Sequence, residues 1–109
     1  MTDKIVVLTT CESEKQAEKL ARHLVTQRVA ACVNILPKAH SIYRWKEKVE
    51  ESAEWLLVIK SRRDLFDALR AEIQTQHSYE VPELIALPVV EGSEPYLDWL
   101  DAQLTTKAG

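Results

Sequence analysis

The chain has 109 residues, a net charge of −3 and a pI of about 5.6. Its length is typical of one domain, and we expect residues 1–109 to form a single domain. Nucleic-acid binding needs a concentrated basic surface, which scattered Lys and Arg residues in an acidic chain do not supply. No segment approaches the roughly 20 apolar residues of a membrane span. We therefore expect neither nucleic acid nor a membrane as a partner.

The first ten residues, MTDKIVVLTT, favour a cytoplasmic location. They carry charges of both signs, and their apolar run from Ile5 to Leu8 is too short for a secretory signal. In a reducing compartment Cys11 and Cys32 are expected to be free thiols. Neither cysteine belongs to a CxxC pair, so the sequence does not predict a structural zinc site.

The first third of the chain predicts a strand and a helix. The run from Ile5 to Leu8 is rich in β-branched residues, which is typical of a buried strand. Ser13 begins a capping box with Gln16 reaching back, which predicts the start of a helix. Apolar residues then recur at helical spacing as far as Arg28; they are Ala17, Leu20, Ala21, Leu24 and Val25.

The middle of the chain predicts an antiparallel hairpin. Val29 to Leu36 reads as a buried strand, which Pro37 interrupts with a bulge or an exposed edge. The extended pattern resumes from Ser41 to Trp45. A second β-rich run, Glu54 to Lys60, follows the charged stretch Lys46 to Glu51, and two such runs joined by a polar segment form a hairpin.

The second half predicts helix, strand and helix. The basic cluster from Lys60 to Arg63 is expected to be a solvated helix start, and the helix that follows has one apolar face formed by Leu65, Phe66, Leu69 and Ile73. The fourth strand runs from Leu84 to Val90, and Pro88 places it at a sheet edge or a bulge. Ser93 caps a third helix with Pro95 in its first turn, and residues 105–109 are expected to form a loose tail.

The order strand, helix, strand, strand, helix, strand, helix predicts an α+β fold. Its first six elements are the split βαβ unit of a ferredoxin-like sandwich, here with a long central β-hairpin and an extra C-terminal helix. Residues 29–45 would span roughly 55 Å as one strand, at about 3.3 Å per residue. A compact domain of this length is only roughly 35 Å across.

The outer half of the hairpin must therefore project from the domain. Its apolar residues are costly to leave in water, and a lone two-stranded ribbon is marginally stable. Its free edges also invite pairing with another chain. We expect a homo-oligomer in which ribbons from several copies pack on one another through Ile42, Tyr43, Trp45, Val49 and Trp55.

Five segments in chain order carry a family resemblance: RVAACVNILP (28–37), SIYRWKEKVE (41–50), LLVIKS (56–61), HSYEVPELIALPV (77–89) and YLDWL (96–100). Through these segments, which cover essentially the whole chain, the sequence resembles the CutA-type divalent-cation tolerance proteins. The resemblance implies a ferredoxin-like homotrimer with intersubunit sheets. It also implies a link to tolerance of copper and other divalent metals, and it implies no known reaction.

The chain departs from the family pattern at the hairpin tip and around the metal ligands. The family usually has glycine where this chain has Glu47, and a glutamate with positive φ there costs on the order of 1 kcal/mol. Metal-binding bacterial members carry a cysteine in the first strand and two adjacent histidines after the second helix. The aligned residues here are Thr9, Gln76 and His77.

The segment TQHSYEVPEL, residues 75–84, holds the candidate metal ligands. Imidazole suits borderline transition metals, and thiolate suits soft ones. Since Cys11 lies near the position of the family's thiol, we predict His77, Cys11 and Glu83 as ligands of copper or another divalent transition metal. The ends of the first strand and second helix are not expected to meet within one subunit, so these ligands would meet across a subunit boundary.

A structural role for the same segment stays open. His77 suits the negative end of the second helix, and Pro82 keeps the preceding residue extended. Tyr79 can pack its ring and form a hydrogen bond through its hydroxyl.

No enzyme signature occurs: GxSxG, P-loop, HExxH and GxGxxG patterns are all missing. We expect a non-enzymatic, homotrimeric divalent-cation tolerance protein that binds copper or other divalent metal ions weakly or indirectly. The alternative is a regulatory or scaffolding trimer that senses a small molecule or docks a protein partner in the clefts between subunits.

Overall fold

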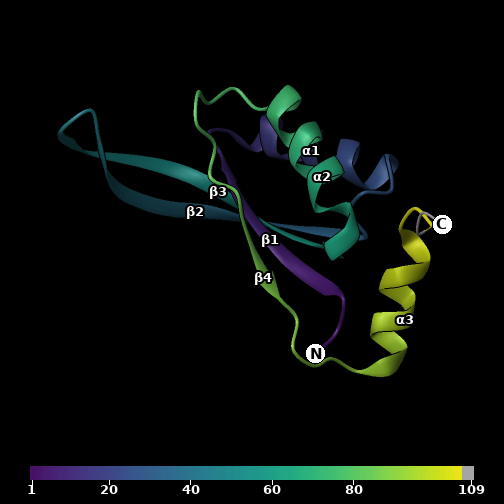
Figure 1. Cartoon of the computed structure of the whole chain (residues 1–109). Helices are drawn as coiled ribbons and strands as arrows, with labels where there is room; N and C mark the ends of the chain where they lie inside the picture. The colour runs from purple at the N-terminus through teal and green to yellow at the C-terminus, as the bar shows by residue number, and fades with distance from the viewer. Residues whose placement is uncertain (107–109) are drawn as a thin grey trace.

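The computed structural model describes residues 1–106 and has the predicted order of elements (Figure 1). A 3₁₀ turn, Arg63–Leu65, precedes the second helix. The strands and α-helices are β1 (Lys4–Cys11), α1 (Glu14–Thr26), β2 (Cys32–Trp45), β3 (Lys48–Arg62), α2 (Phe66–Gln76), β4 (Ile85–Pro88) and α3 (Glu94–Gln103).

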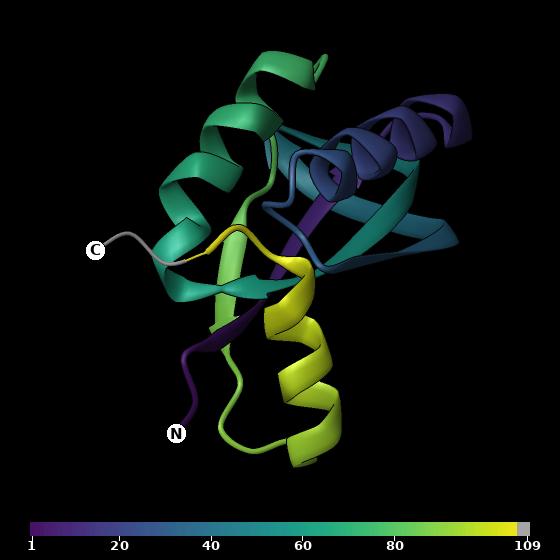
Figure 2. The same ribbon diagram turned by 90° about the vertical axis from the view of Figure 1, so that its right-hand side faces the viewer.

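The strands form one antiparallel sheet in the order β2-β3-β1-β4. Helices α1 and α2 lie side by side across one face of this sheet, and α3 lies at the end of the molecule away from the ribbon tip (Figures 1 and 2). The predicted α+β, ferredoxin-like fold is confirmed. Pro88 ends the edge strand β4, where a residue without an N–H is tolerated.

Helix α1 begins as the capping box predicts. The Ser13 hydroxyl accepts a hydrogen bond from the Gln16 N–H at 3.1 Å, and the Gln16 side chain accepts one from the Glu12 N–H at 3.2 Å. Two N–H groups at the start of the chain's first helix are thereby satisfied.

The residues that close helix α1 also shift the start of the second strand to a later position than predicted. Arg28 adopts a left-handed φ of 60°. The N–H groups of Val29 and Ala30 then donate to the Leu24 carbonyl, at 3.2 and 3.3 Å. These residues close the helix, so β2 begins at Cys32 and the prediction that it begins at Val29 was wrong.

The ribbon formed by β2 and β3 projects from the domain, as expected (Figure 1). Its turn is only Lys46 and Glu47, with φ values of 50° and 68°. Two consecutive residues with positive φ make a type I′ turn, which fits the twist of a hairpin. The charged stretch predicted as a connection is therefore mostly strand, and β3 begins at Lys48. The bulge predicted at Pro37 is confirmed by a register shift between Leu36 and Ala39.

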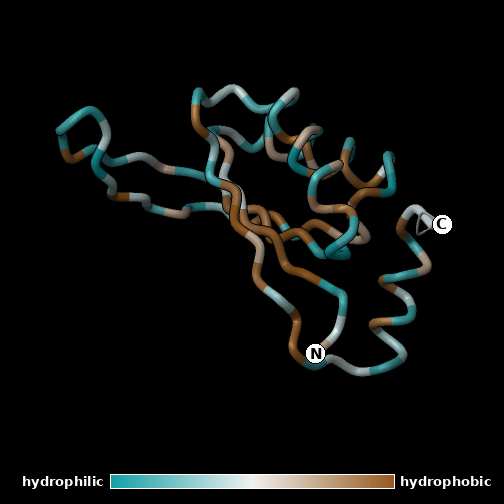
Figure 3. Tube along the Cα trace, in the orientation of Figure 1, coloured by the Kyte–Doolittle hydropathy of each residue, from teal (hydrophilic) through white to brown (hydrophobic). Residues whose placement is uncertain are grey.

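Alternate residues of β1 face the helices and form the centre of the core. Ile5, Val7 and Cys11 are buried there with apolar residues of α1, α2 and β3. Trp55 packs against this cluster, so the prediction that it belongs to the projecting half was wrong. Hydrophobic residues are concentrated where the four strands run together (Figure 3).

The opposite face of the sheet is apolar around its centre, although the register also places Lys60 and Asn34 on it, and the helices α1 and α2 do not cover it. Cross-strand partners share a face, and the register pairs Leu8 with both Val58 and Ile85. The same face continues through the pairs Val6–Leu87, Thr10–Leu56 and Leu36–Leu56. We call this surface the open face. Its apolar side chains are half-buried or exposed, and Ile85 and Leu87 are 50% and 48% exposed.

Helix α3 is attached to the sheet by a buried arginine. Arg62 is 1% exposed and Ser61 is fully buried. The prediction that residues 60–63 form a solvated helix start was therefore wrong, because residues 60–62 are the end of β3. The Arg62 guanidinium donates to Asp64 at 2.6 Å, to Asp101 at 3.0 Å and to the Thr105 carbonyl at 2.6 Å. Lys4 adds an ion pair with Asp101 at 3.3 Å.

The chain after α3 is held in place at its beginning. The Thr105 N–H donates to the Arg28 carbonyl at 3.0 Å. The Arg28 guanidinium donates to the carbonyls of Ala102 and Gln103 at the end of α3. The prediction of a loose tail is therefore wrong at Thr105. Residues 107–109, which the same prediction covers, lie outside the described residues.

Candidate functional site

The segment that connects α2 to β4 is fixed against β1 by His77. The ring nitrogen Nε2 bonds the carbonyl of Thr10 at 2.5 Å, and Nδ1 accepts the backbone N–H of Tyr79 at 3.0 Å. A carbonyl can only accept, so the neutral ring carries its proton on Nε2. The ends of β1 and α2 thus meet within one chain, and the expectation that they would not was wrong.

This arrangement occupies both ring nitrogens of His77. A metal ion would have to displace either the Thr10 carbonyl or the Tyr79 N–H, because each nitrogen offers one bonding position in the ring plane. In the conformation of this structure, His77 orients the loop through hydrogen bonds to Thr10 and Tyr79. This is a structural role, but not the interaction with the helix end that the sequence suggested.

Cys11 is fully buried on the helix-facing side of β1. Burial, with the nearby negative charges of Glu54 and Glu12, raises the pKa of its thiol to about 11. A metal ligand must be the thiolate, so binding at Cys11 requires loss of a tightly held proton.

The third predicted ligand, Glu83, lines a cavity whose walls include neither His77 nor Cys11. Among residues 1–106, no three side chains of the types His, Cys, Asp and Glu lie close enough together to hold a metal ion. The structure therefore does not bring His77, Cys11 and Glu83 together. The metal site remains a prediction.

Tyr79 reaches across the loop to a buried carboxylate that sequence reasoning missed. Its hydroxyl donates to Glu54 Oε2 at 2.8 Å, and Glu54 is 7% exposed. Burial, reinforced by this carboxylate, raises the pKa of Tyr79 above its ordinary value, so it stays a hydrogen-bond donor. The available signal was a glutamate at the start of the apolar run EWLLVIK.

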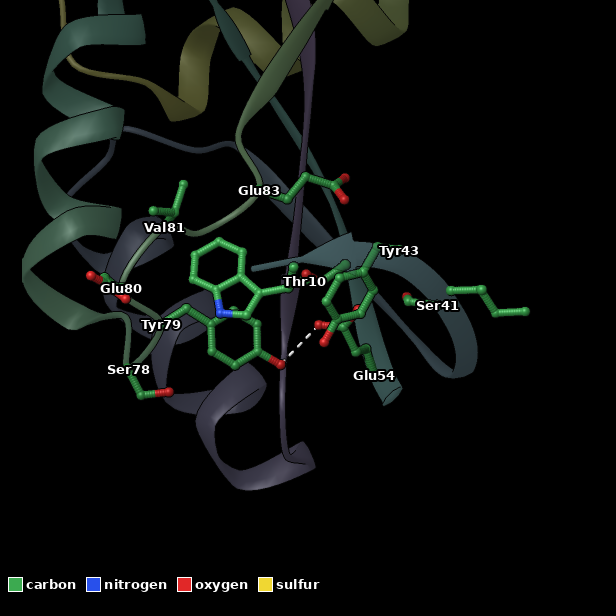
Figure 4. A pocket seen from close by; sticks show the side chains of 11 residues that line it. Thr10, Ser41, Tyr43, Glu54, Ser78, Tyr79, Glu80, Val81 and Glu83 are labelled. Atoms are coloured by element: carbon green, nitrogen blue, oxygen red, sulfur yellow. Dashed lines mark hydrogen bonds between the residues drawn. The ribbon is translucent and has the colours of Figure 1, made fainter. Parts of the chain in front are cut away.

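A cavity of about 720 Å³ lies between the ribbon and this loop (Figure 4). Thr10, at the end of β1, also lines it. Its walls include three aromatic side chains and three carboxylates, namely Tyr43, Trp45, Tyr79, Glu54, Glu80 and Glu83. No Lys, Arg or His side chain is among the lining residues within the described part of the chain. We call it the acidic aromatic cavity.

This fold and site define a ferredoxin-like protein with a projecting ribbon. A family profile described as CutA1 divalent ion tolerance protein matches residues 5–103. The chain therefore belongs to the CutA1 divalent ion tolerance family.

Among relatives, Protein CutA of Mus musculus is 50% identical over 91 residues, which are 84% of this chain and 51% of that protein. The divalent-cation tolerance protein CutA of Thermus thermophilus is 48% identical over 95 residues, 87% of this chain and 92% of that protein. The chain spans about half the length of the mouse, human and Arabidopsis relatives.

Among solved structures, the divalent cation tolerance protein from Thermus thermophilus superposes with a TM-score of 0.91 at 45% identity, covering 94% of this chain and 99% of that one. CutA1 from Oryza sativa superposes with a TM-score of 0.93 at 41% identity, covering 95% of each chain. At these identities the likeness covers both the fold and the family.

Proposed function

We propose that this chain acts as a homotrimer in the cellular response to divalent metal ions, copper among them. The observation that carries the proposal is the open face. A sheet that is apolar on both faces needs a second covering layer, and here α1 and α2 supply only one. The projecting ribbon adds exposed apolar side chains of its own, with Ile42 and Val49 exposed by 63% and 65%.

Self-association is the economical way to cover these residues. Copies of one chain present the same apolar surface to one another, and closed symmetry buries it on every copy. One further feature favours pairing between chains: in the projecting ribbon, β2 and β3 pair only with each other, so their outer edges are unpaired.

Light scattering coupled to size-exclusion chromatography tests the assembly. The wild-type chain is expected to elute at three times its monomer mass of 12.5 kDa. Leu87→Glu places a charge on the open face and is expected to lower that mass. Val25→Glu, an exposed apolar residue on α1, is the matched control and is expected to leave it unchanged. A monomeric wild-type chain would contradict the proposal.

Within that assembly, we propose that metal ions bind weakly or indirectly, with His77, Cys11 and Glu83 as the candidate donors. Calorimetric titration with Cu(II) and Zn(II) tests this role. Direct binding at His77 is supported if the heat of metal binding is lost in His77→Ala but kept in His40→Ala. His40 is a suitable control because it is exposed on the ribbon. Metal heat that is unchanged in His77→Ala contradicts the assignment.

A second function is favoured by the acidic aromatic cavity. A regulatory or scaffolding trimer needs a place to bind a small molecule or a partner, and concave sites with a few polar groups are the usual form of such places. Calorimetry with a panel of metabolites separates the two functions. A heat of binding for a metabolite, together with no heat of binding for metal ions, supports the regulatory function.

We further propose that the protein is non-enzymatic and cytoplasmic. Cys11 and Cys32 are both free thiols, as a reducing compartment requires. Within residues 1–106, no helix has the length and hydropathy needed to cross a membrane. Relatives carry other locations in their names, including a chloroplastic protein of Arabidopsis thaliana and a periplasmic one of Archaeoglobus fulgidus. Cell fractionation tests the location directly.

A further inference from the structure

Glu54 is a buried carboxylate without a cationic partner. It is 7% exposed, and one of its oxygens accepts the Tyr79 hydroxyl. Within residues 1–106, no Lys, Arg or His forms an ion pair with it. Burying a charge is costly unless an opposite charge compensates it. A positive group supplied from outside the chain would compensate this one.

The acidic aromatic cavity is built around this carboxylate. Glu54 and Tyr79 meet inside it, joined by their hydrogen bond, and the ring of Tyr43 lies beside them (Figure 4). Glu80 and Glu83 add negative charge to the lining. The charges of the lining side chains are thus all of one sign, which attracts cations into the cavity.

The aromatic walls decide what kind of cation fits. A divalent metal needs several donor atoms converging on one point, and no such cluster of three acidic, His or Cys side chains is present in the described chain. Aromatic faces instead attract organic cations through their quadrupoles. The chain itself shows this affinity, since Lys46 Nζ lies 5.9 Å from the centroid of the Trp45 ring.

From these observations we infer that the acidic aromatic cavity binds a small organic cation, an ammonium or guanidinium group, with the charge held by Glu54 and the alkyl part packed against Tyr43, Trp45 and Tyr79. The inference gives a ligand class to the regulatory function proposed above and rests on that cavity. It does not depend on metal binding by His77 or Cys11.

The side chain of Tyr79 is preorganised for binding in the ligand-free chain. The His77 ring holds the Tyr79 N–H and also packs against the Tyr79 ring, with centroids 4.7 Å apart. Glu54 holds the other end of the same side chain. A side chain fixed at both ends loses little freedom on binding, which favours affinity.

Choline is a suitable probe, because 3,3-dimethylbutan-1-ol has the same shape without the charge. Isothermal titration on the assembled wild-type protein is expected to give saturable heat with choline and at least about tenfold weaker binding of the alcohol, since only the cation meets the carboxylate and the ring faces. Raising the salt concentration should weaken choline binding. Equal binding of the two probes overturns the inference.

Two variants that each remove one negative charge separate the cavity from the rest of the surface. Glu54→Gln keeps the size of the side chain and an oxygen that can accept the Tyr79 hydroxyl, and it should weaken choline binding about tenfold. Glu50→Gln, on the same strand but outside the lining, should leave binding unchanged. Equal effects of the two variants overturn the inference, because a general electrostatic attraction then explains the binding.

The test also distinguishes a free ligand from a side chain of a second copy. If Lys or Arg of a neighbouring copy already fills the cavity, choline gives no heat at millimolar concentration with the assembled protein, and the inference is overturned. The light-scattering mass is measured on the same sample. A protein of trimer mass without choline heat refutes only the cation site, whereas a monomer with choline heat refutes only the proposed assembly.

Discussion

Glu47 occupies one of the two positions in the ribbon turn where a side chain is a disadvantage. Its φ of 68° lies in the left-handed region, where the Cβ atom of any residue other than glycine is crowded. Lys46 shares the problem with a φ of 50°. The sequence reveals this strain only through the family resemblance, which places a glycine at Glu47, because the local charged residues WKEKVE carry no turn signal of their own.

Replacing Glu47 with glycine should therefore stabilise the protein, by about 1 kcal/mol. The matched control is Glu47→Ala, which removes the same charge and polar atoms but keeps the Cβ atom, and which should bring little gain. Unfolding by denaturant at one fixed protein concentration measures both variants. Equal stabilities of the glycine and alanine variants would contradict the strain argument.

His77 illustrates a residue whose role depends on contacts remote in the chain. Its type and its position after a helix suggested a metal ligand, whereas its two nitrogens bond Thr10 and Tyr79. The contact with Thr10 requires knowledge of where the loop passes the end of β1, and no local pattern contains it. The same is true of Glu54, whose partner Tyr79 lies beyond an entire helix.

His77→Ala should destabilise the folded chain by about 1–3 kcal/mol, because the Thr10 carbonyl and the Tyr79 N–H both lose their partner. Gln76→Ala, the neighbouring substitution, should cost less than about 0.5 kcal/mol. Denaturant unfolding in the presence of a chelator measures the difference without any contribution from metal ions. Similar stabilities of the two variants would show that the loop is held by other contacts.

At the scale of elements, the order of strands and helices was predictable, and several boundaries were not. Periodicity identified each element, and Pro37 correctly marked the bulge. The outer part of β3 was missed because both faces of the ribbon are exposed there, so no alternation of apolar and polar residues marks the strand. The start of β2 was misplaced because the closing residues of α1 are as apolar as a strand.

Helix α3 shows how one element depends on a few charges. Its Asp101 bonds Arg62 and pairs with Lys4, and these positive groups hold the pKa of the Asp101 carboxyl below its usual value of 3.8. A carboxyl group whose pKa is lowered by folding stabilises the fold above its unfolded pKa. That contribution disappears as the pH falls through the folded value. The Asp101 side chain is 44% exposed, so solvent weakens the effect.

Asp101→Asn should therefore lower the thermal midpoint at pH 7 and have a smaller effect as the pH falls below about 4, where the wild-type carboxyl becomes protonated. Thermal scans of both proteins from pH 7 to pH 2.5 measure this convergence. Glu94→Gln, an exposed acidic residue in the first turn of the same helix, controls for a general loss of charge. A difference between Asp101→Asn and the wild type that does not depend on pH would contradict the ion-pair explanation.

For the molecule as a whole, the length of the ribbon was the informative sequence feature. It led to the expectation of self-association, and the structure adds a second reason in the open face, which the periodicity of separate strands cannot reveal. Recognising that face requires the register, which brings Leu8, Val58 and Ile85 together from three strands. The acidic aromatic cavity was likewise unpredictable, since it forms where the ribbon meets a loop distant in sequence.

If assembly covers the open face, the stability of the protein should depend on its concentration, because binding that occurs only in the folded state shifts unfolding by mass action. The thermal midpoint is expected to rise over a hundredfold increase in protein concentration. In the charged variant Leu87→Glu, the midpoint should be lower and nearly independent of concentration. A wild-type midpoint that stays constant over this range would contradict coupled folding and assembly.

The position of β1 in the sheet has a consequence for synthesis of the protein. β1, the first strand of this domain to be synthesised, lies between β3 and β4, and Ile5 is the partner of Pro88. Its last neighbour is therefore made only when most of the chain has been translated. A nascent chain stopped before residue 85 would keep one side of its first strand unpaired and would remain a substrate for chaperones until translation resumes.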